Sequence, residues 1–184
     1  MCMSDLLAIC HTNSECFDIL DIFVSRYQRF SDIKLKLLSD KKYKDYDCFV
    51  YNNSLSYRER WISVLLNCEE THILTLHEDF ILYNNIHLDN NYIGYDFIRL
   101  QKNGIFSNIN ITENIFKIEN GDHVFSMTPC IWKKEILLSL LLNSKTSTVW
   151  ELENENIYYS GLNGGYYYCG EAKRGLSHYD SNIF

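Results

Sequence analysis

Two adjacent carboxylates follow a short apolar run in residues 71–80, THILTLHEDF. The run is typical of a buried strand in an α/β sheet, and a helical pattern precedes it. Because an unpaired carboxylate is very costly inside such a strand, we expect Glu78 and Asp79 at its carboxyl end. Open α/β sheets bind ligands at that end, and paired carboxylates there can hold a hard divalent cation. A surface turn with two acids is the alternative, and His77 is expected to pack or orient rather than to bind metal.

A second acidic segment reads Trp150-Glu151-Leu152-Glu153. A carboxylate held beside a tryptophan at a helix start can have a raised pKa and serve as a general base, which makes Glu153 and Glu151 catalytic candidates. The alternative is a helix amino terminus that carries acids, which the helix dipole favours in any protein.

Cations that could meet phosphate oxygens lie at three positions. Arg99 ends an expected strand, and Lys173 and Arg174 lie in a glycine-flanked tail. Such side chains form charge-assisted hydrogen bonds with phosphates, although solvent-exposed salt bridges are the ordinary alternative. His178 follows closely and is a candidate late metal ligand, while a lone histidine is more often structural.

Several classes of protein are disfavoured by what the sequence contains. It has no Gly-x-Gly-x-x-Gly turn, P-loop or nucleophile elbow, which weighs against dehydrogenases, P-loop kinases and α/β-hydrolases. A formal charge of -7 argues against a nucleic-acid partner. The seven scattered cysteines lack any Cys-x-x-Cys pair, which favours free thiols in a reducing compartment. No apolar run approaches the ~20 residues of a transmembrane helix, so we expect a cytoplasmic protein.

Hydrophobic periodicity predicts the order β-α-β-β-α-β in the first part of the chain, which favours a mostly parallel sheet with crossover helices. The expected strands cover residues 6–10, 33–38, 46–51 and 73–76, and the expected helices cover 16–30 and 57–68, the second capped by Ser56. Further on we expect an irregular helix within 81–95, a strand at 95–100, short strands within 105–125 and a helix at 133–142. The 184 residues suffice for one core, so the predicted fold class is a single α/β domain whose central sheet is flanked by helices.

Several of these segments together resemble GT-A-type glycosyltransferases, in particular a small bacterial and viral family-2-like group. Ser56-Tyr57-Arg58-Glu59-Arg60-Trp61 with its helix, and the strand that runs into Glu78-Asp79, resemble the donor-site half. Residues 125–134, followed by the Trp-Glu-Leu-Glu segment, are similar to the acceptor-side half. The resemblance covers roughly residues 5–155 and implies one GT-A-like, Rossmann-like domain over 1–184, with a donor half of about 1–100 and an acceptor half of about 101–184.

The resemblance also implies roles for particular residues. Asp79, with Glu78, would hold Mn or Mg against the donor diphosphate, and His178 would be a late metal ligand. Glu153, or less favourably Glu151, would sit where an inverting enzyme keeps its general base. The implied donor-binding residues are His11, Thr12 and Asn13 after the first strand, Asp40, Arg60, Lys173 and Arg174.

The expected function is therefore metal-assisted transfer of a sugar from a nucleotide-sugar donor to a hydroxyl of a glycan or lipid-linked acceptor. The transfer would take place in the cytoplasm, or in the host cytoplasm if the protein is viral. Two other classes stay open. One is a non-catalytic nucleotide-sugar-binding or scaffold protein with the same fold. The other is a metal-dependent phosphoesterase, which normally needs a second Asp/His cluster beyond His77-Glu78-Asp79.

Overall fold

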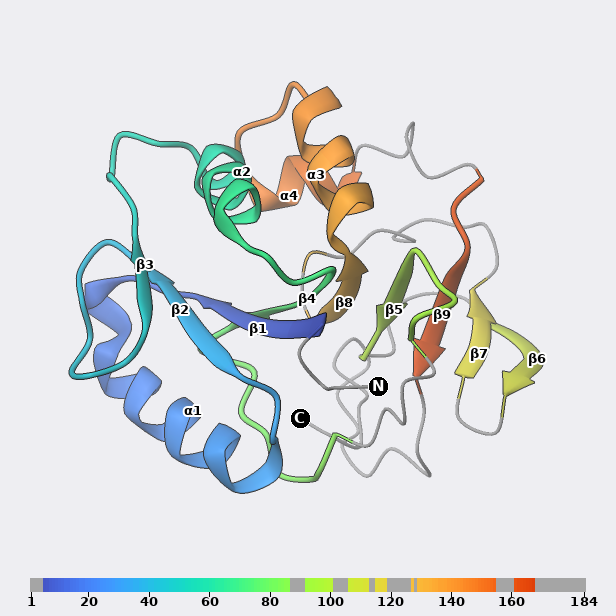
Figure 1. Cartoon of the computed structure of the whole chain (residues 1–184), viewed down its shortest axis with the longest axis horizontal. Coiled ribbons are helices and arrows are strands. Elements are labelled where there is room, and N and C mark those ends of the chain that lie inside the picture. Colours follow the sequence, from blue (N-terminus) through green and yellow to red (C-terminus); the bar gives the residue numbers. More distant parts are fainter. Residues whose placement is uncertain are drawn as a thin grey trace.

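A nine-stranded sheet with the order β3-β2-β1-β4-β8-β5-β9-β7-β6 runs through the protein (Figure 1). The computed structural model describes residues 5–86, 92–100, 106–112, 115–118, 127, 129–154 and 161–167. Its strands are β1 (Leu6–His11), β2 (Leu35–Ser39), β3 (Cys48–Val50), β4 (His72–His77), β5 (Phe97–Arg99), β6 (Phe106–Thr112), β7 (Ile115–Ile118), β8 (Cys130–Lys133) and β9 (Gly164–Tyr167). Its helices are α1 (Phe17–Phe30), α2 (Tyr57–Asn67), α3 (Lys134–Asn143) and α4 (Val149–Asn154), with a 3-10 turn η2 (Ser14–Cys16).

Strand direction divides the sheet into two parts. The four strands β3, β2, β1 and β4 are parallel to one another. Beyond them β8 is antiparallel to both β4 and β5, β9 is parallel to β5, and β7 is antiparallel to β9 and β6. The predicted α/β fold is thus confirmed, with its parallel strands concentrated where the β-α-β-β-α-β pattern was expected.

The helices cover opposite faces of the sheet. In Figure 1, α1 lies on one side of the parallel strands and α2, α3 and α4 lie together on the other. Because successive strand residues point to opposite faces, Leu6, Ala8 and Cys10 of β1 pack with α1, whereas Leu7 and Ile9 pack with α2 and α3. A β1 that is apolar on both faces is the expected signature of a parallel strand between two helix layers.

Local signals in the sequence account for the starts of both crossover helices. Ser56 accepts a hydrogen bond from the Glu59 amide while the Glu59 side chain accepts one from the Ser56 amide, which is the expected cap of α2 in the form of a capping box. Asn13 accepts a hydrogen bond from the Glu15 amide and caps η2, which leads into α1.

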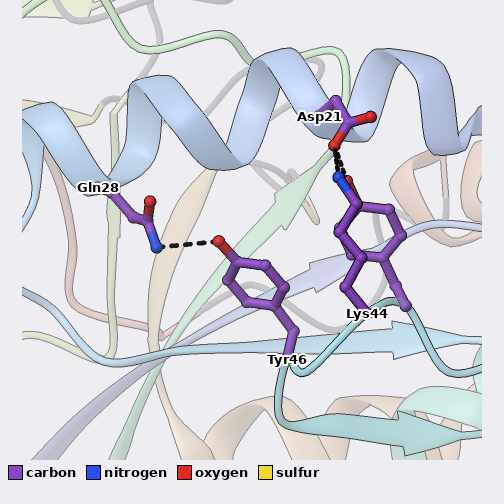
Figure 2. A network of polar contacts seen from close by, with 5 residues as sticks. Asp21, Gln28, Lys44 and Tyr46 are labelled. Atoms are coloured by element: carbon purple, nitrogen blue, oxygen red, sulfur yellow. Dashed lines mark hydrogen bonds and ion pairs between the residues drawn. The ribbon is translucent and has the colours of Figure 1, made fainter.

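The connection from β2 to β3 is fastened onto α1 by polar contacts (Figure 2). Asp21 of α1 accepts hydrogen bonds from the Lys44 ammonium and the Tyr43 hydroxyl. Two helical turns further on, Gln28 Nε2 donates to Tyr46 Oη at 2.9 Å. This connection leaves the sheet at Asp40, so α1 braces the segment that follows a candidate donor-binding residue.

The structure differs from expectation at residues 130–133. They form strand β8, which the sequence did not predict, because its insertion between β4 and β5 depends on long-range pairing. Residues 81–86 and 92–95 contain no helix, and residues 87–91, the rest of the segment in which an irregular helix was expected, lie outside the described residues. Tertiary contacts hold this segment, because Leu82 and Tyr92 are buried and Arg26 Nε donates to the Leu82 carbonyl at 3.0 Å. Other expectations were met: β6 and β7 are the short strands foreseen within 105–125, and α3 is the helix foreseen at 133–142.

Five cysteines fall in the described part of the chain, and all are free: Cys10, Cys16, Cys48, Cys68 and Cys130. Among the described residues, no helix combines the length and apolar character needed to cross a membrane.

Candidate functional site

The chain reverses its direction of winding between β1 and β4. From β1 it passes through α1 on one face to β2, and from β3 it returns through α2 on the other face to β4, on the opposite side of β1. Such a switch point opens a crevice at the carboxyl ends of the two strands, where open α/β sheets bind ligands. His11 and His77, the last residues of β1 and β4, are register partners at this edge.

Glu78 and Asp79 form the two central residues of a turn at this switch point. Strand β4 ends at His77, whose carbonyl accepts a hydrogen bond from the Phe80 amide at 3.2 Å. Glu78 is half-buried and Asp79 is exposed. Both acids therefore follow the buried strand, as the sequence predicted, and their side chains are accessible to a ligand.

The loop after β1 is tied to Asp40. The Ser14 amide donates to Asp40 Oδ1 at 2.6 Å and the Ser14 hydroxyl to Oδ2 at 2.9 Å. Burial raises the pKa of Asp40, but the hydrogen bonds from Ser14, together with those from the Ser39 hydroxyl and the Asp40 backbone, outweigh it and lower that pKa. Thr12 is buried, and its carbonyl accepts a hydrogen bond from the Tyr51 hydroxyl at 2.9 Å. Asp40 therefore shapes the loop that carries three candidate donor-binding residues.

An aromatic cluster supports the switch point on the α2 face. His11 stacks on Tyr51 with ring centroids 5.6 Å apart and meets Tyr57 at 4.9 Å. It also lies 6.3 Å from Trp61 and 5.6 Å from His77. Burial, with smaller contributions from His77 and Arg60, lowers the pKa of His11 to about 3. His11 is thus a neutral packing partner at neutral pH.

Arg60 lies beside the same cluster. Its guanidinium carbon is 4.1 Å from the Tyr51 ring centroid, and its Nε donates to the Leu55 carbonyl at 2.9 Å. Because the Tyr51 ring stacks on His11, Arg60 lies near the end of β1. A half-buried cation is therefore held close to the switch point.

Tyr57 connects the two predicted acidic segments. Its hydroxyl lies 3.0 Å from His77 Nε2. Burial raises the pKa of Tyr57, and the negative charges of Glu153 and Glu78 raise it further. The charges of Glu78, after β4, and of Glu153, on α4, thus both act on the pKa of one phenol, although the two acids are far apart in the sequence.

Glu153 and Glu151 have different surroundings. Glu153 is half-buried, and its Oε1 accepts a hydrogen bond from the Met127 amide at 3.0 Å. Glu151 is exposed, and its Oε2 accepts hydrogen bonds from the Thr148 amide at 3.1 Å and the Thr148 hydroxyl at 2.9 Å. These bonds, from the hydroxyl first, lower the pKa of Glu151. Glu151 caps α4, in agreement with the alternative that helix-terminal acids are structural.

Within the described part of the chain, no group of three His, Cys, Asp or Glu side chains is arranged to hold a metal ion. Glu78 and Asp79 offer two adjacent carboxylates at the switch point. That donor set fits Mg²⁺ or Mn²⁺ in its usual mode, because such ions keep several waters and take one or two carboxylates together with substrate phosphates. The candidates Lys173, Arg174 and His178 lie outside the described residues.

Sequence reasoning missed two residues of this site, Tyr51 and Tyr57. Tyr57 directly follows the helix cap Ser56, which predicts where the residue sits along the helix but not what its hydroxyl meets. The pairing of His11 with His77 likewise depends on strand register, which has no local signal. The occurrence of a histidine as the last residue of two apolar runs is the one feature that could have pointed here.

No family model matches the sequence, and no curated protein matches it. Solved structures do match its fold. CMP:2-keto-3-deoxy-manno-octonic acid synthetase, solved in complex with CTP, aligns with a TM-score of 0.61 and 9% identity over 95% of this chain and 93% of its own. A nucleotidyl transferase from Methanothermobacter thermautotrophicus aligns with a TM-score of 0.58 and 8% identity over 88% of this chain and 86% of its own.

Two longer proteins also match. Residues 1–349 of TarS from S. aureus align with a TM-score of 0.58 and 11% identity over 88% of this chain, and bifunctional IspDF from Campylobacter jejuni aligns at 0.52 and 13% over 97%. The chain spans 57% and 54% of their respective lengths. At these identities the similarity shows the fold: the chain has the α/β architecture of proteins that include a CTP-bound synthetase and a nucleotidyl transferase.

Proposed function

We propose that this protein is a transferase that acts on a nucleotide-sugar, and specifically a glycosyltransferase that moves the sugar to a hydroxyl of a glycan or lipid-linked acceptor. The observation that carries the proposal is the position of the Glu78-Asp79 turn. It lies at the switch point of a Rossmann-like sheet, beside a loop braced by Asp40, and directly after His77, whose Nε2 lies 3.0 Å from the Tyr57 hydroxyl. Similarity in fold to a CTP-bound synthetase supports a nucleotide ligand.

Two groups of residues would bind the donor at the switch point: one around the loop after β1, and one in the turn after β4. His11, Thr12, Asn13 and Asp40 form or brace the donor loop, and Arg60 supplies positive charge near the phosphates. Asp79 and Glu78 would hold Mn²⁺ or Mg²⁺, which when bound neutralises the charge that develops on the leaving diphosphate.

Glu153 is the proposed general base. Its carboxylate takes the proton of the acceptor hydroxyl as the new carbon–oxygen bond forms at the anomeric carbon and the bond to the nucleoside diphosphate breaks. The Met127 amide orients one of its oxygens. Glu151 has no part in this scheme, because its carboxylate is used at the start of α4.

A panel of nucleotide-sugars, with Mn²⁺ or Mg²⁺, tests the proposal through thermal shift followed by transfer and hydrolysis assays. Asp79→Ala is expected to abolish turnover while its melting temperature stays close to that of the wild type, because Asp79 is exposed. Normal turnover of this variant would refute the assignment. Nucleotide-sugar binding without transfer or hydrolysis would instead support the non-catalytic alternative.

Nucleotidyl transfer is a second candidate, and similarity in fold supports it. The chain aligns with the CTP-bound synthetase at a TM-score of 0.61 and with the nucleotidyl transferase at 0.58. A nucleotidyltransferase joins a nucleoside triphosphate to its sugar substrate and releases pyrophosphate, whereas a glycosyltransferase releases a nucleoside diphosphate from a nucleotide-sugar. Incubation with each nucleoside triphosphate and a panel of sugars and sugar phosphates, read out as pyrophosphate, separates the two. Pyrophosphate release that depends on Asp79 would replace glycosyl transfer as the preferred function.

A further inference from the structure

The Glu78-Asp79 turn is anchored at both ends by rings that point to opposite faces of the sheet. Phe80, after the turn, is 8% exposed and belongs to the core on the α1 face. His77, before the turn, follows Leu76 of that core and therefore points to the α2 face, where its Nε2 lies 3.0 Å from the Tyr57 hydroxyl. Glu78 and Asp79 thus lie between the packed ring of Phe80 and the imidazole of His77, which contacts the Tyr57 hydroxyl.

The Tyr57 side of this arrangement is rigid. Tyr57 is the first residue of α2, directly after the Ser56 cap, and the reciprocal bonds between Ser56 and Glu59 fix that end of the helix. The Tyr57 ring also packs edge-on against His11 at 4.9 Å and Trp61 at 6.4 Å between centroids. A hydroxyl held in this way can fix the orientation of the ring that it binds.

We propose that Tyr57 is a positioning residue for the metal-binding carboxylates. Its hydroxyl donates to Nε2 of His77, which leaves the imidazole proton on Nδ1 and fixes the rotation of the ring. The fixed ring holds the first residue of the turn, so Glu78 and Asp79 present their oxygens in one arrangement. The inference rests on the proposed function, in which these two carboxylates hold the divalent cation.

The decisive variant is Tyr57→Phe, which keeps the ring and removes the hydroxyl. Loss of a residue that orients metal ligands from outside typically weakens metal affinity by about 10–100-fold, and we expect a loss near the lower end, about tenfold. The affinity is measured without nucleotide or turnover, by electron paramagnetic resonance of free Mn²⁺ during titration of the full chain. Tyr27→Phe is the matched control: its buried hydroxyl donates to the Ile33 carbonyl at 3.1 Å, its ring belongs to the α1-face core, and its removal should leave Mn²⁺ affinity unchanged.

The tautomer of His77 gives a second readout that requires no metal. Nitrogen-15 spectra of the wild-type imidazole are expected to show the Nδ1-protonated tautomer, and Tyr57→Phe should shift the population toward the other tautomer. The resonances are assigned by their loss in His77→Phe, a variant that also removes the same hydrogen bond from its other side. If Tyr57→Phe does not fold, His77→Phe should show the same tenfold loss of Mn²⁺ affinity.

The outcomes distinguish this inference from the proposed function. Equal Mn²⁺ affinity in Tyr57→Phe and the wild type would overturn the positioning role and leave the function intact. A wild-type protein that binds no Mn²⁺, either alone or in the presence of a nucleoside diphosphate, would contradict the metal-assisted function, and the positioning role with it. Equal loss in Tyr57→Phe and Tyr27→Phe would show a general effect of lost stability and would also overturn the inference.

Discussion

Asp40 is expected to act on the donor loop through Ser14, and a double-mutant cycle can measure this. Ser14→Ala removes the hydroxyl that donates to Asp40 Oδ2 at 2.9 Å, while Asp40→Ala removes this bond and the 2.6 Å bond from the Ser14 amide. A hydrogen bond to a charged group contributes about 1.5–3 kcal/mol. Both side chains are half-buried, so we take less than the lower limit, about 1 kcal/mol, for the coupling through the hydroxyl.

The assay is urea unfolding of the wild type, the two single variants and the double variant. Asp40→Ala should lower the free energy of unfolding more than Ser14→Ala, because it also loses the bonds from the Ser14 amide and from the Ser39 hydroxyl. In the Asp40→Ala background, Ser14→Ala should cost about 1 kcal/mol less than in the wild type. The effects of substitutions at distant sites on the free energy of unfolding are additive within about 0.3–0.5 kcal/mol. A coupling below about 0.3 kcal/mol would therefore refute the claim that Asp40 holds the donor loop through the Ser14 hydroxyl.

The pH dependence of the same coupling gives an independent check. The pKa of Asp40 is lowered in the folded protein, since burial, which raises it, is outweighed by the hydrogen bonds from Ser14, Ser39 and the Asp40 backbone together. The stabilisation is therefore fully present above the unfolded pKa of about 3.9 and is lost as the pH falls through the folded pKa. Coupling that survives unchanged well below pH 3 would mean that the carboxylate charge is not involved.

Three further predictions concern the base, the sheet and acid stability. Glu153→Gln should lower kcat by at least about 100-fold, whereas Glu151→Gln should leave kcat within about twofold; equal losses would contradict the division of roles. Gly164→Ala should destabilise the protein by about 1–3 kcal/mol in urea unfolding, because the new Cβ would overlap a phenylalanine ring of β5, while Gly94→Ala, with nothing within 4 Å, should not. Burial lowers the pKa of His11 from 6.5 to about 3, so between these pH values the unfolded chain binds a proton that the folded protein does not. The free energy of unfolding should therefore fall as the pH drops from 6.5 to about 3. His11→Phe should reduce this dependence on pH, and an unchanged dependence would assign it to other groups.

Local signals determined much of the parallel half of the fold. The apolar runs of β1 and β4, the amphipathic α1 and the Ser56 cap each follow from residues within one or two turns of chain. The position of Glu78 and Asp79 beyond β4 followed from the cost of burying a carboxylate, which is a property of the residues themselves. Local signals also placed Glu151 and Glu153 at a helix start. They could not show that Glu151 caps the helix while Glu153 accepts a hydrogen bond from the distant Met127 amide.

Tertiary structure alone decided what meets at the switch point. Strand β8 forms only because β4 and β5 provide edges on both of its sides, so no local periodicity announced it. Register placed His11 beside His77, and helix packing brought Tyr57 to His77 and near Glu153. These contacts join residues far apart in the chain, and their geometry depends on how the layers pack. The sequence thus determined the types of group at the site, whereas packing determined which of them act together.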